Sequence, residues 1–391
     1  MPRTSSGRGQ ALQFTYVHVE NWKNFRFMET SLQRRVFLVG PNASGKSNLL
    51  DVFRFLRDLV AIGGGFQEAV RRRGGVSSIR CLSARKHPDI TIRVHIGNED
   101  KPEEWVYELQ FTQDSQRRRP VVRREKVVHD GSTLLERPNA EDKSDTERLT
   151  QTYLEQVNVN KDFRQVVDFL TSVRYLHVVP QLVREPERSI GRANDPYGGD
   201  FLEQIARTNE RTRKARFSRI LHALVVAVPQ LKELELFRDE RGAPHLRGKY
   251  EHWRPQGAWQ NEDQLSDGTL RLFGLLWSLL DGHGPLLLEE PELSLHPEVV
   301  RYIPQMLARV QRGTGRQLLI STHSSELLRD EGIGLDEVLL LIPGREGTLV
   351  QPISELTEAE SLLEGGVGLD EIVLAKTAPA GIQQLGLFGD R

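Results

Sequence analysis

The chain has 391 residues, a net charge of −1 and 38% hydrophobic residues, enough for one large or two medium globular domains with a substantial core. Because 53 basic residues stand against 54 acidic ones, no global charge excess draws it to nucleic acid or membrane, and any such binding must come from local patches. The single cysteine, Cys81, excludes an internal disulfide framework and a cysteine-based zinc site, and it fits a reducing cytoplasm.

Membrane and export signals are not apparent. The longest apolar run, Leu270 to Leu280, is interrupted by Arg271 and Ser278 and is too short to span a bilayer. Residues 1–11 lack the apolar segment of a secretory signal, so we expect a disordered leader. These features predict a cytoplasmic protein that does not enter a membrane.

Strands dominate the predicted elements of the first half. Phe14 to Val19 alternates apolar and polar residues, and a partner strand begins at Phe25. Val36 to Val39 is an apolar run typical of a buried strand, and a helical pattern follows it to about Val60. Three antiparallel strands are expected next, at Ile90 to Ile96, Trp105 to Phe111 and Val121 to Val128. A polar loop from Glu136 to Asp145 and a helical segment from Thr146 to Leu170 follow them.

In the second half, buried strands alternate with helices. A strand runs from Val173 to Val179, and an amphipathic helical pattern from Phe201 to Val228 is broken near Asn209. Further on come helix Gln264 to Leu280, strand Pro285 to Glu290, helix Pro297 to Arg312, and strands Gln317 to Ser321 and Val338 to Ile342. Apolar strands separated by helices predict an α/β fold with a mixed central sheet, mainly parallel at its centre and flanked by helices.

A phosphate-binding P-loop follows the strand Val36 to Val39. Residues 40–47 read G-P-N-A-S-G-K-S, with the strand before and the helix after that this motif requires. Its glycines let backbone N–H groups surround phosphates at the positive end of a helix. We expect Lys46 to reach the β- and γ-phosphates of ATP and Ser47 to bind Mg²⁺. The residues predicted to hold the nucleotide here are Gly40, Asn42, Ala43, Ser44, Gly45, Lys46, Ser47 and Asn48.

Three further polar residues end buried strands. Glu289 is expected to hold Mg²⁺, and Glu290 to polarise the attacking water. His323 can hydrogen-bond the γ-phosphate and sense its loss. Taken singly, each also fits a structural role at a strand exit. Together with the P-loop they predict a hydrolytic site in which Lys46, Glu290 and His323 are catalytic.

A fourth motif, L-S-D-G-T at residues 265–269, precedes a helix. The Ser266 hydroxyl and backbone N–H groups such as that of Gly268 can bind an anion at a helix N-terminus. The alternative is a plain capping turn, since serine and aspartate both cap helices well. The segment resembles the signature motif of ABC-type ATPases in its L-S-x-G form. The order of the motifs, from P-loop through this segment to Glu289 and then His323, favours that interpretation over the capping turn.

This ordered set resembles the ABC-type ATPases of the non-transporter branch, which holds SMC, RecF and OLD-type proteins. More narrowly, the run Glu289-Glu290-Pro291-Glu292 and the entry strand around Asn24 and Phe25 resemble the stand-alone AAA-family ATPases grouped with OLD proteins, found in bacterial DNA-repair and anti-phage defence systems. The resemblance covers roughly residues 12–60 and 263–343. OLD proteins also carry a TOPRIM nuclease domain, for which the 48 residues after Pro343 are too few.

The resemblance implies a P-loop NTPase of ABC type with an antiparallel β lobe and a helical insertion. We expect a leader at 1–11, the ATPase core at 12–62 and 260–353, the β lobe and insertion at 63–259, and a C-terminal tail at 354–391. It also implies a homodimer or higher oligomer. Two protomers pair head to tail around ATP, so that Ser266 and Gly268 of one reach the γ-phosphate bound by Lys46 of the other. The segment 293–296 then stands at the interface as the D-loop.

The resemblance further implies an ATP hydrolase that acts on the β–γ phosphoanhydride. Dimerisation would control nucleic-acid binding or a separately encoded nuclease or toxin effector in genome maintenance or anti-phage defence. Two alternatives stay open: an ATP-binding scaffold with little turnover, and the ATP-binding subunit of an ABC transporter. The acidic run at 289–292, the long insertion and the lack of membrane segments weigh against the transporter.

Partner-binding features lie outside these motifs. Arginine clusters at 71–73, 117–119 and 123–124, with Arg174, Arg184, Arg188 and Arg192 further on, could contact DNA or RNA phosphates. Interleaved acids favour instead a solvated, internally paired surface. Residues Gln384 to Phe388 read Q-L-G-L-F and resemble the peptide by which bacterial DNA enzymes bind the sliding clamp, although an apolar tail packed on its own domain is the alternative. Gln67 is the candidate for the glutamine-bearing loop of the family.

Overall fold

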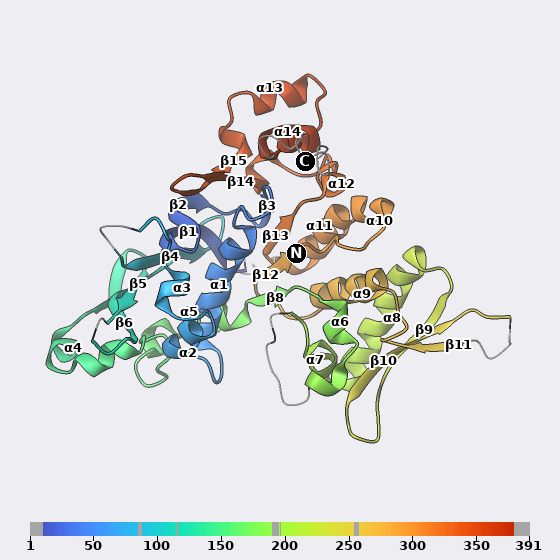
Figure 1. Cartoon of the computed structure of the whole chain (residues 1–391), viewed down its shortest axis with the longest axis horizontal. Helices are drawn as coiled ribbons and strands as arrows, with labels where there is room; N and C mark the ends of the chain where they lie inside the picture. Colours follow the sequence, from blue (N-terminus) through green and yellow to red (C-terminus); the bar gives the residue numbers. More distant parts are fainter. Residues whose placement is uncertain are drawn as a thin grey trace, which may run out of the picture.

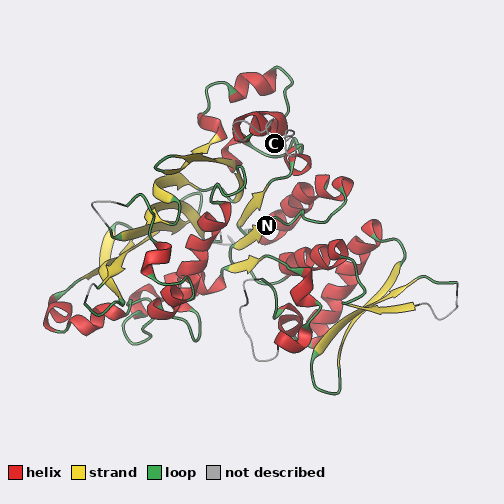
Figure 2. Ribbon diagram, viewed as in Figure 1, coloured by secondary structure: helices red, strands yellow, loops and turns green. Residues whose placement is uncertain are grey.

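The computed structural model describes residues 11–84, 88–114, 116–189, 195, 197–253 and 258–378. Within these residues the strands form three sheets, and helices pack against them (Figure 2). Figure 1 shows the antiparallel lobe and the helical insertion on opposite sides of a central sheet, with the last helices above it.

The central sheet carries the predicted motifs. Its strand order is β15-β14-β3-β13-β12-β8, parallel from β14 to β8 with β15 antiparallel at one edge. The mixed, mainly parallel sheet is therefore confirmed. Its strands are β3 (Arg35–Val39), β8 (Arg174–Leu176), β12 (Leu286–Glu289), β13 (Leu318–Thr322), β14 (Val338–Gly344) and β15 (Gly347–Pro352). Because parallel strands end at one edge, the segments after β3, β12 and β13 meet there.

The β lobe is a six-stranded antiparallel sheet of order β2-β1-β4-β5-β6-β7. Its strands are β1 (Gln13–Trp22), β2 (Phe25–Ser31), β4 (Ile90–Gly97), β5 (Trp105–Gln113), β6 (Pro120–His129) and β7 (Ser132–Arg137). Helix α1 (Lys46–Val60) packs between this sheet and the central one, since its buried side chains share one core with both. Its Phe53 and Phe55 contact Phe14 and Phe111 of the lobe. Short helices α2 (Phe66–Arg71) and α3 (Val76–Ile79) complete this side.

The insertion has its own core. Helices α6 (Pro180–Val183), α7 (Phe201–Arg207) and α8 (Glu210–Ala227) pack with the antiparallel strands β9 (Leu231–Arg238), β10 (Pro244–Tyr250) and β11 (Ala258–Asn261) and with α9 (Asp267–Leu280). The predicted break in the long helical pattern is confirmed, because Asn209 caps α8 with its side chain. In Figure 1 this unit is the green and yellow part on the right.

The C-terminal third differs from the prediction in two places. The helix expected at 297–312 is two helices, α10 (Pro297–Arg301) and α11 (Ile303–Thr314), because Pro304 has no N–H to continue the first one. Within the expected tail, helices α13 (Ala359–Glu364) and α14 (Leu369–Thr377) form, and α14 packs on α12 (Ser325–Leu328) through an Arg329–Asp370 ion pair of 2.9 Å. The clamp-like peptide Gln384 to Phe388 lies outside the described residues.

The helix predicted over Thr146 to Leu170 is mostly wrong. Only α5 (Arg164–Ser172) is α-helical there, with two short 3₁₀ turns, Thr146–Thr150 and Lys161–Phe163, before it. The buried carboxylate of Glu125 accepts the N–H of Tyr153 at 2.8 Å, which draws the chain into the core instead of into a helix.

The polar loop predicted from Glu136 contains the end of β7 and the short helix α4 (Ala140–Ser144). Here Arg137, 1% exposed, bonds the carboxylates of Glu125 and Asp142 at 3.0 and 2.8 Å. The polar residues of this segment thus form a buried ion-pair network.

Cys81 is buried, at 4% exposure. Across the described ranges, the helices are too short or too polar to cross a bilayer.

Candidate functional site

The P-loop turns sharply between β3 and α1, and its glycines are needed for that turn. Gly45 has a φ of 101°, and a Cβ there would lie 2.1 Å from the side-chain amide of Asn24. That amide donates to the Ser44 carbonyl at 2.8 Å, and its oxygen accepts from Asn48 at 2.7 Å. A Cβ on Gly40 would lie 2.5 Å from a carbonyl oxygen of β14. The loop is thus held closely between the β1–β2 hairpin and the central sheet.

Lys46 begins α1 and points back into the loop. Its Nζ donates to the carbonyls of Gly40 and Pro41 at 3.0 and 3.2 Å, and the residue is only 6% exposed. Burial lowers the pKa of Lys46 from 10.5 to about 8, although the carboxylates of Glu290 and Glu289 oppose this shift. The ammonium group therefore lies inside the cradle in which a phosphate would meet it.

Ser47 and Glu289 lie together at the adjacent strand end. The Ser47 hydroxyl donates to Glu289 Oε1, and the Tyr175 hydroxyl donates to Glu289 Oε2. A hydroxyl and a carboxylate beside a phosphate cradle suit Mg²⁺, which takes oxygen ligands and usually draws the rest from phosphates and water. The described ranges contain no group of three or more His, Cys, Asp or Glu side chains able to hold a metal by themselves. The oxygens present thus fit a magnesium ion that is shared with a nucleotide.

Glu290 and His323 face each other across the same edge. His323 Nε2 lies 3.0 Å from Glu290 Oε1, and His323 Nδ1 lies 3.5 Å from Lys46 Nζ. The tautomer that carries its proton on Nε2 satisfies both contacts. The hydrogen bond from His323 holds the pKa of Glu290 below its usual value, although partial burial acts in the opposite direction. Glu290 also has a φ of 44°, a strained backbone of the kind that gathers at functional sites.

Glu292 fixes the loop that carries His323. Its Oε1 accepts from the Thr322 hydroxyl at 2.6 Å and from the His323 backbone N–H at 3.1 Å. Burial raises the pKa of this carboxyl. The acidic run at 289–292 therefore contributes to the site at three points.

Ser266 and Gly268 lie at the N-terminus of α9, on the insertion side of the molecule. Ser266 Oγ accepts the Thr269 N–H at 3.2 Å, so the capping role is present. A Cβ on Gly268 would lie 2.6 Å from the Ser294 carbonyl oxygen, and Arg184 pairs with Asp267 at 2.6 Å. In the described part of the chain, no hydrogen bond joins this segment to the P-loop. One protomer therefore does not bring these two predicted halves of the site together.

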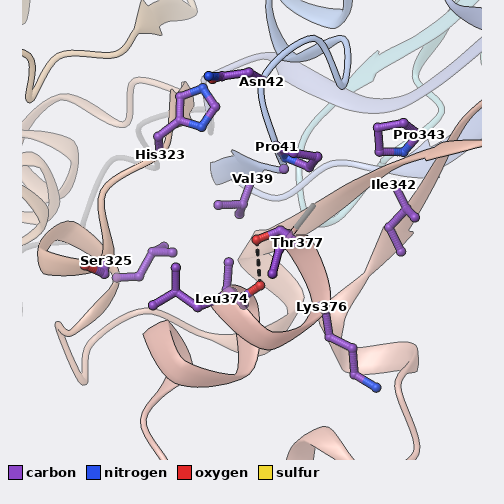
Figure 3. A pocket seen from close by; sticks show the side chains of 14 residues that line it. Val39, Pro41, Asn42, His323, Ser325, Ile342, Pro343, Leu374, Lys376 and Thr377 are labelled. Carbon is purple, nitrogen blue, oxygen red and sulfur yellow. Dashed lines mark hydrogen bonds between the residues drawn. The ribbon is translucent and has the colours of Figure 1, made fainter. Parts of the chain in front are cut away.

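A cavity of about 730 Å³ opens beside the P-loop (Figure 3). Asn42 and His323 lie on one side of it, and Leu374, Lys376 and Thr377 of α14 lie on the other. Thr377 bonds the Val373 carbonyl at 2.8 Å and closes the last turn of that helix. Helix α14 thus forms one wall of the cavity beside the P-loop.

Most arginines of the predicted nucleic-acid clusters have acidic partners within the chain. Arg71 and Arg72 pair with Glu68, Arg117 and Arg119 with Glu147, and Arg124 with Glu108 and Glu136. Arg73 is buried against Asp51 and Asp58. The pairing favours the solvated, internally compensated surface. Arg192 and the side chain of Arg188 lie outside what the structure describes.

The sequence did not single out Tyr175, Glu292 or Asn24 as site residues. Tyr175 appeared only as part of a strand, and its partner Glu289 is 114 positions away. Gln67, the candidate for the glutamine loop, bonds the carbonyls of Pro120 and Thr150 at 3.0 and 2.6 Å and stabilises the β lobe.

Comparison with known proteins agrees with this geometry. Residues 35–329 match the family described as "AAA domain, putative AbiEii toxin, Type IV TA system". No curated protein matches the sequence significantly.

Similar solved structures are SMC heads. An SMC head bound to the C-winged helix domain of ScpA aligns with a TM-score of 0.53 at 12% identity, covering 86% of this chain and 96% of that one. The Smc head of Pyrococcus furiosus, bound to the C-terminal domain of ScpA, aligns with a TM-score of 0.53 at 11% identity. This alignment covers 91% of this chain and 99% of that one. The Smc head of Pyrococcus yayanosii aligns with a TM-score of 0.50 at 10% identity, and the alignment covers 91% of this chain and 100% of that one. These likenesses confirm the ABC-type head fold.

Proposed function

Because this chain belongs to the AAA-domain family described as a putative AbiEii toxin of a type IV TA system, and because it has the ABC-type head fold, we propose that it binds and hydrolyses ATP with Mg²⁺. The proposal rests on three groups that meet at one edge of the central sheet. They are the ammonium group of a lysine, a serine hydroxyl paired with a carboxylate, and a second carboxylate paired with an imidazole. The residues are Lys46, Ser47, Glu289, Glu290 and His323.

Each residue then has a role that its contacts allow. Lys46 exchanges its bonds to the loop carbonyls for phosphate oxygens. Ser47 and Glu289 would hold Mg²⁺, and that ion would supply positive charge to neutralise the phosphates. Glu290 accepts a hydrogen bond from the attacking water once His323 turns toward the γ-phosphate. In the structure described above, His323 bonds Glu290 and occupies that carboxylate.

We further propose that hydrolysis needs two protomers. Ser266 and Gly268 stand at a helix N-terminus, a position that can bind an anion, and within one chain the Ser266 hydroxyl accepts the Thr269 N–H. A head-to-tail partner would supply them to the γ-phosphate bound at Lys46. The close approach of Gly268 to Ser294 joins this segment to residues 293–296, so the two would move at the interface as one unit.

The cellular role proposed for the dimer is to control nucleic-acid binding or a separately encoded nuclease or toxin effector, in genome maintenance or anti-phage defence in the cytoplasm. The family description supports the toxin–antitoxin setting. Nucleic-acid binding through the arginine clusters is tested by a shift assay on duplex DNA at several salt concentrations. Binding that disappears only as salt rises supports it, and no binding at low salt removes it.

Glu290→Gln tests the catalytic proposal. It keeps the shape of the side chain and removes the base, so ATP hydrolysis should fall by about 10²-fold or more while nucleotide binding persists. Gel filtration with light scattering should then show an ATP-dependent dimer that accumulates. Glu331→Gln, on an exposed turn, is the matched control. Wild-type turnover in Glu290→Gln, or no change in assembly with ATP, would count against the proposal.

A further inference from the structure

Tyr175 bridges three elements of the nucleotide region. It lies in β8, which pairs in parallel with β12, so that Tyr175 stands beside Leu287 and its hydroxyl reaches the end of that strand. There it donates to Glu289 Oε2, while Ser47 donates to Oε1. The Glu289 carboxylate is therefore held from both sides, by the P-loop helix and by a neighbouring strand.

The ring of Tyr175 is itself held in place. The guanidinium carbon of Arg54, on α1, lies 4.1 Å from the ring centroid, a distance at which a cation is attracted to an aromatic face. Arg54 Nη1 in turn lies 3.7 Å from Oδ1 of Asp51, one helical turn earlier. The hydroxyl is thus directed at one carboxylate oxygen.

From this geometry we propose that Tyr175 is a positioning residue for the Mg²⁺ site, an inference that rests on the proposed ATPase function. By occupying Glu289 Oε2, the hydroxyl fixes the rotation of the carboxylate so that Oε1 faces Ser47. Mg²⁺ demands near-ideal octahedral geometry, and partners that orient a metal ligand usually contribute 10- to 100-fold to metal affinity. Without the hydroxyl, Glu289 can rotate and the ordered pair with Ser47 is lost.

Tyr175→Phe removes only the hydroxyl and keeps the ring under Arg54. The full chain is incubated with a slowly hydrolysed ATP analogue, and its Tm is followed as Mg²⁺ is titrated. We expect Tyr175→Phe to need about tenfold more Mg²⁺ than wild type to reach half of the metal-dependent rise in Tm. Stabilisation by the nucleotide in EDTA should not change. Hydrolysis of ATP should return toward the wild-type kcat at high Mg²⁺.

Tyr107→Phe is the matched control, since Tyr107 also bonds a buried carboxylate, Glu125 at 3.3 Å, but in the β lobe. Its Mg²⁺ midpoint should equal that of wild type. A wild-type midpoint in Tyr175→Phe would overturn the positioning role while the ATPase proposal stands. If wild type itself shows no nucleotide effect and no Mg²⁺ effect, both proposals fall. A lower Tm of Tyr175→Phe without nucleotide, together with an unchanged Mg²⁺ midpoint, would show that Tyr175 has only a structural role.

Discussion

Nucleotide affinity should fall as the pH rises above 8, because Lys46 loses its proton there. Burial of the side chain lowers the pKa of Lys46 to about 8. A bound triphosphate would keep Lys46 protonated, since a nearby opposite charge favours the charged form of a group. About nine tenths of the lysines are then protonated at pH 7 and about one tenth at pH 9, so affinity should fall by about tenfold between the two.

Fluorescence anisotropy of a labelled ATP analogue, titrated with the protein from pH 7 to 9.5 at fixed Mg²⁺, measures this dependence. Lys46→Arg is the control, because a guanidinium stays charged throughout this range. Its affinity, though weaker, should stay flat. The stability of the free protein should move in the opposite direction. The pKa of Lys46 in the folded state lies below its unfolded value of 10.5, so this group adds stability as the pH rises from about 8 to 10.5. A flat wild-type affinity up to pH 9.5 would refute the reasoning.

Two further substitutions test the interface and the β lobe. Gly268→Ala places a Cβ 2.6 Å from the Ser294 carbonyl oxygen; such overpacking costs roughly 1–3 kcal/mol. Light scattering should show loss of ATP-dependent assembly with single-chain nucleotide affinity kept, and intact assembly would speak against the shared site. Arg137→Met leaves Glu125 buried without its partner, and urea denaturation should show a loss of about 3–5 kcal/mol. Arg117→Met, at an exposed ion pair, should lose less than about 1 kcal/mol; equal losses would contradict the buried network.

Local sequence patterns were sufficient where one contiguous segment makes the feature. The strand before Gly40, the helix from Lys46 and the break at Asn209 all depend on near neighbours, and the structure confirms them. The carboxylates of Glu289, the last residue of β12, and of Glu290 after it were predictable for the same reason, because a buried strand presents its end at the sheet edge.

Features that depend on distant pairing were not predictable. Tyr175 reaches Glu289 only because β8 and β12 are neighbours in the sheet, and residue spacing carries no sign of that. The segment around Tyr153 was assigned to a helix because its pattern allows one. It is irregular because its backbone N–H groups are taken up by the carboxylate of Glu125, nearly thirty residues earlier. The packing of α14 likewise joins distant segments, because its Leu369 and Val373 share a buried core with Leu327 and Leu328 of α12.

The burial of Cys81 makes this protein well suited to site-specific labelling. It is the single cysteine of the chain, and at 4% exposure it is shielded from maleimide reagents. A cysteine introduced at Lys376, whose side chain is 41% exposed and lines the cavity beside the P-loop, would be the accessible thiol. An environment-sensitive dye attached there could follow nucleotide entry and partner docking in real time, without first removing a native thiol and disturbing the core.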